Sequence, residues 1–411
     1  ALLVMGDDVA ACLLVHAYRK FDRKSRVILV ARTRDLGYSH RLLPYYSVGL
    51  TTSLRMFSQQ LLELVDAVRV VLLDEIELVG MDRVIIRGEV NPLSRLVIAG
   101  WLAPHPYRRQ VLHLSNPQSA EELRDLLEAG LRSVVVLEGL GALPLVDALV
   151  RVGIRPIFVL GSKGVNEVFD LDVGGMLLSA LTEKGVRMVS TIEEAPGDHL
   201  HVAFPGGILW IPPQLRLEIP RRDLLEVDGE LNVEGNPRLK AVGYVTRLRD
   251  PETGLSHRVL SEEEAILQAL TCALSFRGFK PANLCRYYAA WLGDRLYSSL
   301  GLTQSEARKL GLDVVVTRVR GWGSWSGSLV KLIATRDGAL IGAQLILDSS
   351  QTSLIGPLYY LVCSKAHISS AHISLSPFPP LSPPLDDPLH HALQALVRKL
   401  FLRQARRWEG G

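Results

Sequence analysis

The sequence predicts an α/β protein that contains two βαβ units, followed by a smaller α+β region. The first unit has an apolar strand at 2–5, a helical pattern at 9–19 and a second strand at 26–31. The same order returns at 131–137, 140–152 and 156–160. A strand, a crossover helix and a strand at this spacing pair in parallel with a right-handed crossover. Two such units favour two Rossmann-like domains over one long sheet.

The pattern changes from about residue 271 onward. Alternating apolar strands are predicted at 312–319, 329–333 and 340–346. The Asp337-Gly338 turn between the last two strands is a strong hairpin signal. A proline-rich segment and an amphipathic basic helix at 390–407 follow. Antiparallel strands combined with helices indicate a separate α+β domain.

Length and composition restrict the class of protein. The 411 residues exceed one ordinary core, and 48% hydrophobic with 22% charged residues is typical of a globular protein. Lys and Arg number 46 against 43 Asp and Glu, an excess of 3 that is too small to indicate a nucleic-acid-binding protein. No apolar run approaches the roughly 20 residues that span a bilayer. No basic region precedes Ala1, so we expect neither a membrane span nor a signal peptide.

Cysteine usage favours a reducing environment. The four cysteines, Cys12, Cys272, Cys285 and Cys363, lie far apart in mostly apolar surroundings and form no CxxC pair. This spacing predicts buried free thiols. We therefore expect a cytoplasmic protein.

Four stretches in collinear order carry a resemblance to a known family. They are Leu43-Pro44-Tyr45-Tyr46, the turn and helix start at 301–307, the hairpin 331–344 and the proline-rich segment 379–388. In this order they resemble the NADH oxidase and coenzyme A-disulfide reductase branch of the pyridine-nucleotide–disulfide oxidoreductases. The resemblance covers nearly the whole chain.

The resemblance implies three domains and two nucleotide cofactors, FAD and NAD(P)H. Residues 1–110 and 206–270 would form a discontinuous FAD-type Rossmann-like domain, and 111–205 an inserted NAD(P)-type Rossmann-like domain. Residues 271–411 would form a C-terminal α+β dimerisation domain. A homodimer, or a pair with an active paralogue, follows from that last domain.

The first βαβ turn departs from the pattern that binds a dinucleotide. That pattern needs glycines, because the backbone must turn tightly and approach the pyrophosphate without a Cβ. The turn keeps Gly6, but its three fingerprint positions hold Met5, Asp7 and Ala10. Carboxylates at Asp7 and Asp8 suit a helix N-terminus but would repel a diphosphate placed there. We interpret these two residues as caps of the first helix.

The other positions that would contact a nucleotide also differ from the family pattern. Ala31 stands where an acid would hold a ribose hydroxyl, Trp101 stands in place of a glycine, and Tyr244 stands in place of an aspartate. In the second βαβ unit the positions concerned are Gly139 and Ala142. The acid missing at Ala31 removes about 1.5–3 kcal/mol of charged hydrogen bonding. A tryptophan at position 101 would fill space meant for a flavin. The second unit also lacks an acid at the end of its second strand, Val159-Leu160-Gly161.

Arg41 stands where the resemblance places the redox cysteine. An arginine cannot form a thiolate or a mixed disulfide. No cysteine is near Arg41 in sequence, and Cys12 on the first helix could approach only through the tertiary fold. We therefore assign no catalytic residue.

Four further features have a functional and a structural interpretation. The loop 161–164 (Gly-Ser-Lys-Gly) could cradle a phosphate, although an ordinary turn is favoured. No acid or cysteine completes a metal set with His367 and His372 or with His390-His391, so no metal site is predicted. The segment 321–325 holds two tryptophans and suits a docking surface or, preferably, a rim against a partner subunit. The basic helix suits an acidic partner, RNA or a membrane face, although a solvated basic face is preferred.

The residues expected to bind cofactors or react are absent at several independent positions. Their absence favours a catalytically degenerate homologue without flavin or redox cysteine, which acts as a binding, regulatory or assembly subunit. The alternative is an FAD- and NAD(P)H-dependent oxidoreductase with an altered, non-cysteine active site. A further alternative is an RNA- or ribosome-associated protein that uses the basic helix, whose affinity would fall steeply with salt.

Overall fold

The computed structural model describes residues 1–54, 68–103, 110–204, 208–209, 224–279, 284–322, 326–373 and 388–408. The chain divides into two compact units. The first unit comprises Ala1–Ser162 and Lys184–Leu284, and the second comprises Lys163–Glu183 and Cys285–Gly411.

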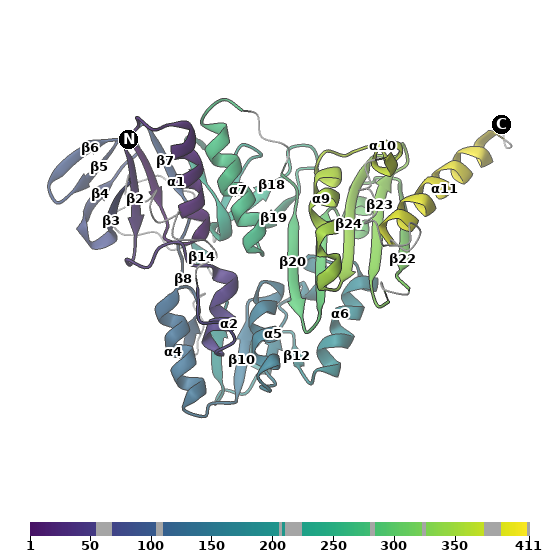
Figure 1. Cartoon of the computed structure of the whole chain (residues 1–411), viewed down its shortest axis with the longest axis horizontal. Coiled ribbons are helices and arrows are strands. Elements are labelled where there is room, and N and C mark those ends of the chain that lie inside the picture. Colours follow the sequence, from purple (N-terminus) through teal and green to yellow (C-terminus); the bar gives the residue numbers. More distant parts are fainter. Residues whose placement is uncertain are drawn as a thin grey trace. The chain divides into compact units, whose positions relative to one another are not determined.

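A nine-stranded sheet organises the first unit, in the order β19-β18-β15-β16-β17-β7-β1-β2-β3 (Figure 1). Its strands are β1 (Leu2–Met5), β2 (Val27–Ala31), β3 (Arg69–Leu72), β7 (Arg95–Ile98), β15 (Leu225–Val227), β16 (Asn232–Val233), β17 (Asn236–Ala241), β18 (Thr246–Arg249) and β19 (Ser256–Arg258). The neighbours from β17 to β3 all pair in parallel. Helices α1 (Val9–Phe21) and α7 (Glu262–Ser275) pack against each other beside this sheet.

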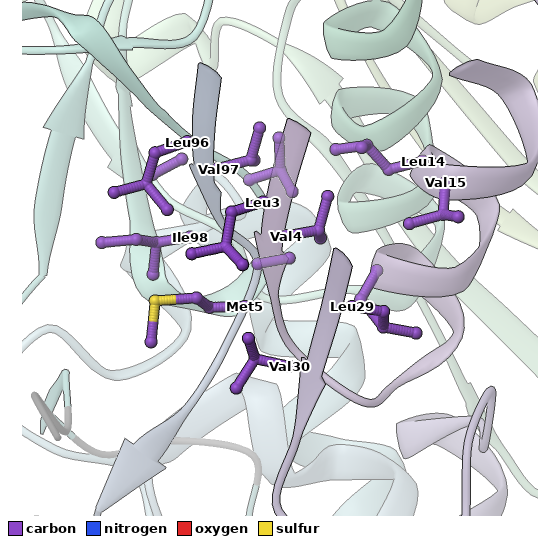
Figure 2. Close-up of a cluster of buried hydrophobic side chains, with 14 of the residues drawn as sticks. Leu3, Val4, Met5, Leu14, Val15, Leu29, Val30, Leu96, Val97 and Ile98 are labelled. Carbon is purple, nitrogen blue, oxygen red and sulfur yellow. The ribbon is translucent and has the colours of Figure 1, made fainter. Parts of the chain in front are cut away.

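The core of the first unit lies on both faces of β1. Every residue of β1 and β2 is buried, as expected for parallel strands that are covered on both sides. Figure 2 shows the alternation along β1: Leu3 and Met5 lie toward Ile98 of β7, whereas Val4 lies toward Leu14 of α1. This period of two places apolar side chains on both faces and leaves the strand ends to carry polar groups.

The first unit also contains a five-stranded parallel sheet in the order β12-β11-β10-β13-β9. Its strands are β9 (Val111–His113), β10 (Val134–Leu137), β11 (Ile157–Val159), β12 (Arg187–Val189) and β13 (Leu200–Ala203). Helix α4 (Pro117–Glu128) begins with a capping box on Asn116 and a proline in its first turn. Helices α2 (Leu43–Ser47) and α5 (Leu143–Arg151) pack together nearby. Smaller sheets join β4 (Ile76–Val79), β5 (Arg83–Ile86) and β6 (Glu89–Pro92), and β8 (Leu102–Ala103) with β14 (Ile208–Leu209).

The second unit is built on an antiparallel sheet in the order β20-β21-β24-β23-β22. Its elements are β20 (Tyr287–Leu292), β21 (Arg295–Gly301), β22 (Val314–Arg320), β23 (Leu329–Thr335), β24 (Leu340–Leu347), α6 (Leu171–Glu183), α8 (Gln304–Lys309), α9 (Ile355–Cys363), α10 (Ile368–Ile373) and α11 (Pro388–Trp408). Helix α11 packs on β22 and β23 through Leu389, Leu393, Leu396 and Leu400. This amphipathic stripe explains why a highly charged helix is held on the sheet.

A buried ion-pair network attaches the start of α6 to this sheet. The Lys331 side chain is fully buried, and its Nζ lies 2.8 Å from carboxylate oxygens of both Asp170 and Asp172. The backbone N–H groups of Gln304 and Ser305 donate to Asp170 at 2.9 Å. Each buried charge of the network therefore has a partner, and removal of one partner would leave an uncompensated buried charge.

The predicted fold class is confirmed. Both βαβ units form with parallel pairing, and the Asp337-Gly338 turn joins the antiparallel pair β23–β24. The proline-rich segment of the resemblance lies almost entirely outside the described residues, at 374–387. Among the described residues, no helix has both the length and the apolar character required to cross a bilayer.

The expectation of four free thiols is wrong. Cys285 and Cys363 form a disulfide between the start of β20 and the end of α9, across 78 positions of sequence. The sequence did not predict this disulfide because the two cysteines lie far apart along the chain. Only the packing of α9 on the sheet brings them together. Cys12 and Cys272 are free and buried, as predicted.

Candidate functional site

The turn between β1 and α1 forms one side of the candidate site. Gly6 is required there by packing, since a Cβ on it would lie 2.9 Å from Cβ of Ala11. Asp7 and Asp8 follow, and their side chains are 2% and 5% exposed. Met5 and Ala10 are also buried. The turn therefore keeps a close strand-to-helix approach while it presents two carboxylates instead of bare backbone.

Asp8 caps α1, as the sequence predicts. Its carboxylate accepts a hydrogen bond of 2.9 Å from the backbone N–H of Ala11. The same side chain lies 3.3 Å from Nε2 of His40. An anionic oxygen thus occupies the N-terminal turn of the helix, where free N–H groups attract anions.

Asp7 does not cap α1, so that part of the capping interpretation is wrong. Its carboxylate instead reaches the end of β2, where Nε of Arg32 lies 3.2 Å away and the Arg32 backbone N–H donates at 3.1 Å. The hydroxyl of Tyr38 donates to it at 3.0 Å. Burial, reinforced by the neighbouring Asp7 charge, raises the pKa of Tyr38 well above its ordinary value, so the hydroxyl stays a donor.

The strand-end position that lacks an acid, Ala31, is fully buried. The next residue, Arg32, turns its guanidinium back to Asp7 and lies with its Cζ 5.7 Å from the Trp101 ring centre. The Tyr38 hydroxyl oxygen also lies 3.0 Å from the carbonyl oxygen of Ser115, so its single proton is shared between this carbonyl and Asp7. The Asp7–Arg32–Tyr38 cluster therefore lies next to Ala31, where the resemblance implies an acid that holds a ribose.

One cavity in this region is small. Trp101 and Tyr244 are 3% and 8% exposed and line a cavity of about 20 Å³ together with Asp8, His40 and Arg32. A single ordered water needs about 10–15 Å³ by the same kind of measure. The cavity is thus the size of one or two water molecules. The rings of Tyr244 and His40 lie edge to face, 5.1 Å apart.

Arg41 is joined to the first turn of α7. Its guanidinium forms an ion pair with Glu263, and its backbone N–H lies 3.4 Å from Glu262. The hydroxyl of Ser39 donates to Glu262 at 2.6 Å. Burial raises the pKa of Glu262, and the hydrogen bond from Ser39 opposes that change. The residue at the redox-cysteine position is therefore part of a salt-bridged contact between the α2 region and α7.

Sequence reasoning missed His40, Glu262 and Glu263 as members of this site. Three consecutive glutamates after Ser261 do signal a helix N-terminus, which they form in α7. They do not signal a partner for Arg41, because more than 200 positions separate the two. Only the packing of the loop before α2 against the first turn of α7 brings them together.

Both free cysteines are buried. Cys12 is 5% exposed, and burial, with Asp8 and Asp7 adding to it, raises the pKa of its thiol to about 12. Burial raises the pKa of Cys272 to about 12 as well. Thiolates are the reactive form, so both thiols are inert near neutral pH.

The turn of the second βαβ unit, between β10 and α5, is closed by buried side chains. Gly139 and Ala142 lie in a short 3-10 turn between β10 and α5, and Leu140 within it is fully buried. Next to it, Asp147 accepts the hydroxyl of Tyr45 at 2.8 Å. Burial and the Asp147 charge raise the pKa of Tyr45 above its ordinary value. Tyr45, from the stretch 43–46 that carries the resemblance, thus forms a hydrogen bond with helix α5 of the same chain.

The remaining candidates have structural partners or lie outside the described residues. His367 contacts Ser369 and the Asp337 carbonyl, and His390 contacts Gln394. The side chain of His372 and the segment 323–325, with Trp325, lie outside the described residues. Trp322 packs on His391, with their ring centres 4.6 Å apart. The described part of the chain holds no cluster of three or more potential metal ligands. Residues 161–163 form an exposed turn.

The backbone of the basic helix is described to Trp408, and its side chains are described only up to Leu402. Lys399 donates to the carbonyl of Val316 at 2.7 Å, so one of its cations serves packing on β22. The side chains from residue 403 onward lie outside the described residues.

Comparison with known proteins gives structural relatives and no sequence relative. No protein-family model and no curated protein sequence matches the chain. A NAD-dependent persulfide reductase from A. fulgidus is similar at a TM-score of 0.77 and 19% identity, over 97% of this chain and 83% of that one. A pyridine nucleotide-disulfide family oxidoreductase from Enterococcus faecalis V583 is similar at a TM-score of 0.76 and 15% identity, over 97% of this chain and 100% of that one. A water-forming NADH oxidase from Lactobacillus brevis, solved with NADH bound, is similar at a TM-score of 0.76 and 15% identity, over 98% of this chain and 99% of that one.

Proposed function

We propose that this chain, which has the fold of the pyridine nucleotide-disulfide oxidoreductases, is a binding or assembly subunit that holds no flavin and carries out no disulfide chemistry. One observation carries the proposal. The buried carboxylates of Asp7 and Asp8 stand at the turn where a dinucleotide-binding fold receives diphosphate. The groups that would meet the cofactor are already bonded within the chain.

Electrostatics weigh against a diphosphate at this turn. Two like unit charges 4 Å apart repel by about 4 kcal/mol at an effective dielectric constant of about 20. A helix N-terminus stabilises an anion by only about 0.3–1 kcal/mol. An unpaired carboxylate at that distance would therefore repel a phosphate more than the helix attracts it, and the Arg32 guanidinium offsets part of this repulsion at Asp7. The small cavity beside Trp101 and Tyr244 supports the same conclusion.

The chemistry of the site supports the loss of redox function. Disulfide reduction needs a thiolate beside the electron donor. Arg41 occupies that position and is paired with Glu263. With the pKa of the thiol at about 12, Cys12 is less than roughly 0.01% ionised at neutral pH.

The assembly role is proposed for the C-terminal domain, at 271–411, through a homodimer or a pair with an active paralogue. The three most exposed large apolar side chains in the described residues belong to the second unit. Tyr360 and Phe401, each 68% exposed, lie within 271–411 and support this location, whereas Leu171, at 75%, lies outside those bounds. Exposed apolar side chains mark association surfaces where they form a contiguous patch. Light scattering on the purified chain tests the homodimer, which has twice the mass of one chain.

The absorption spectrum of the purified protein tests the loss of flavin, together with FAD titration followed by flavin fluorescence. We expect a colourless protein whose addition leaves the fluorescence of FAD unchanged. Flavin bands near one per chain would overturn the proposal. That result would support the alternative, an oxidoreductase with an altered, non-cysteine active site.

A further inference from the structure

A patch of cations and two exposed phenyl rings lies at the amino edge of the nine-stranded sheet. This amino-edge patch comprises Lys20, Phe21, Arg23, Lys24, Arg26 and Phe279, all of which are exposed. Helix α1 ends at Phe21 and β2 begins at Val27, so the loop between them lies at the amino ends of the parallel strands. The Asp7–Arg32–Tyr38 cluster lies at their carboxyl ends. The patch is therefore separate from the candidate site.

Asp22 holds the loop that displays the cations. Its carboxylate accepts the Ser25 hydroxyl at 2.7 Å and the Tyr18 hydroxyl at 3.1 Å, and the backbone N–H of Lys24 donates to it at 3.1 Å. Hydrogen bonds from Ser25 hold the pKa of Asp22 well below its ordinary value. Arg277, just after α7, lies 3.2 Å from the same carboxylate. The one acid of this loop is thus bonded to the loop itself and to the α7 end.

The displayed cations lack acidic partners in the described part of the chain. Lys20, Arg23, Lys24 and Arg26 take part in none of its ion pairs. Some exposed arginines elsewhere in the first unit do have such partners, among them Arg69 with Glu89 and Arg87 with Glu75. Four neighbouring like charges on a rigid loop favour an anionic partner.

The two phenyl rings indicate which anionic partner fits. Phe21 is 46% exposed and Phe279 is 59% exposed, and their ring centres lie 6.4 Å apart at an angle of 47°. Rings packed on each other at this angle do not offer the aligned platforms on which successive bases stack. Phenyl rings also carry no polar atom for a hydrogen bond. Apolar rings flanked by Lys and Arg suit the boundary between lipid headgroups and acyl chains.

We propose that the amino-edge patch docks this protein on anionic lipid bilayers. Phe21 and Phe279 enter the headgroup region, while the four cations contact anionic headgroups. Each cation close to an anionic membrane surface strengthens binding about fivefold. The docking does not depend on whether the chain holds a flavin, so its test stands apart from that of the proposed function.

Vesicle flotation with the full chain tests the proposal, with vesicles of phosphatidylcholine alone and of phosphatidylcholine mixed with phosphatidylserine. We expect binding to the mixed vesicles alone, weakening as salt is added. The double variants Phe21→Ser/Phe279→Ser and Arg23→Glu/Lys24→Glu should each lower the bound fraction at least about tenfold. Their thermal unfolding should match the parent chain, because the altered side chains are exposed.

A matched control separates this patch from the C-terminal helix. Arg398 is exposed on α11, as the basic residues of the patch are exposed on their loop. Arg398→Glu should leave vesicle binding unchanged. Loss of binding in this variant but not in the patch variants would overturn the proposal. Equal binding to both vesicle types, no binding at low salt, or a preference for an oligothymidylate over the anionic vesicles would overturn it as well.

Discussion

The Asp8 carboxylate accepts the backbone N–H of Ala11 at 2.9 Å, in the first turn of the helix that follows the central strand. A dinucleotide-binding fold directs such N–H groups at phosphate. Here the chain provides its own anion, and His40, 3.3 Å from Asp8, ties that anion to the loop before α2. A protein carboxylate therefore accepts a hydrogen bond from the first turn of this helix.

Replacement of this cap should separate its hydrogen bond from its charge. Asp8→Ala should lower the free energy of unfolding by about 0.5–2 kcal/mol, because the Ala11 N–H loses its acceptor. Asp8→Ser should retain most of that stability, since a hydroxyl also caps a helix. Urea unfolding measures both variants. Equal losses in the two would mean that the His40 contact, rather than the cap, is the stabilising interaction.

Lys331 should be far more sensitive than its half-exposed neighbour in the same network. Lys331→Met leaves Asp170 and Asp172 without their buried cation, which should cost about 3–5 kcal/mol. Arg318, 53% exposed and paired with Asp172, serves as the control. Arg318→Met should cost less than about 1 kcal/mol. Similar costs for the two variants in chemical denaturation would contradict the burial argument.

The two free thiols should be unreactive in the folded chain. With the pKa of both Cys12 and Cys272 at about 12, the thiolate fraction at pH 8 is only about one in ten thousand. A colorimetric disulfide reagent at pH 8 should label neither thiol in native protein and both in urea. Rapid labelling of one thiol without denaturant would show that it is accessible and ionised.

The Cys285–Cys363 disulfide should stabilise the second unit. Loss of a crosslink across 78 positions should reduce stability by about 4 kcal/mol in the chain-entropy account. Cys285→Ser should therefore unfold earlier than the parent chain under oxidising conditions. The difference should vanish when both are measured with a reductant, which serves as the control. A difference that persists there would assign the effect to packing of the side chain.

Glu262 should make stability fall as pH rises above the ordinary glutamate range. Burial raises its folded-state pKa above 4.5, so the folded chain holds a proton that the unfolded chain releases. Its favourable contribution is present below that value and is lost as pH rises through the raised pKa. Glu262→Gln should remove this part of the pH dependence. Unfolding free energies from pH 4 to pH 8 should show a flatter profile for the variant, and an unchanged profile would refute the assignment.

The candidate site shows where sequence reasoning ended. The positions of departure, such as Ala31, Arg41 and Trp101, could be found because a known pattern states what each should be. What replaced the expected groups could not be found. Arg32 pairs with Asp7 across 25 positions, and Arg41 with Glu263 across 222. No periodicity connects residues so far apart.

The sequence by itself determined the parallel strands, their crossover helices and the hairpin around Asp337-Gly338, because these features follow from hydrophobic period and local turn chemistry. Only the tertiary structure decided which polar groups meet. It directed Asp7 to Arg32 and Tyr38 instead of to its own helix, and it joined Cys285 to Cys363. A strand or helix is set by neighbours within a few residues. Charged and sulfur partners are set by how whole elements pack, which local sequence does not encode.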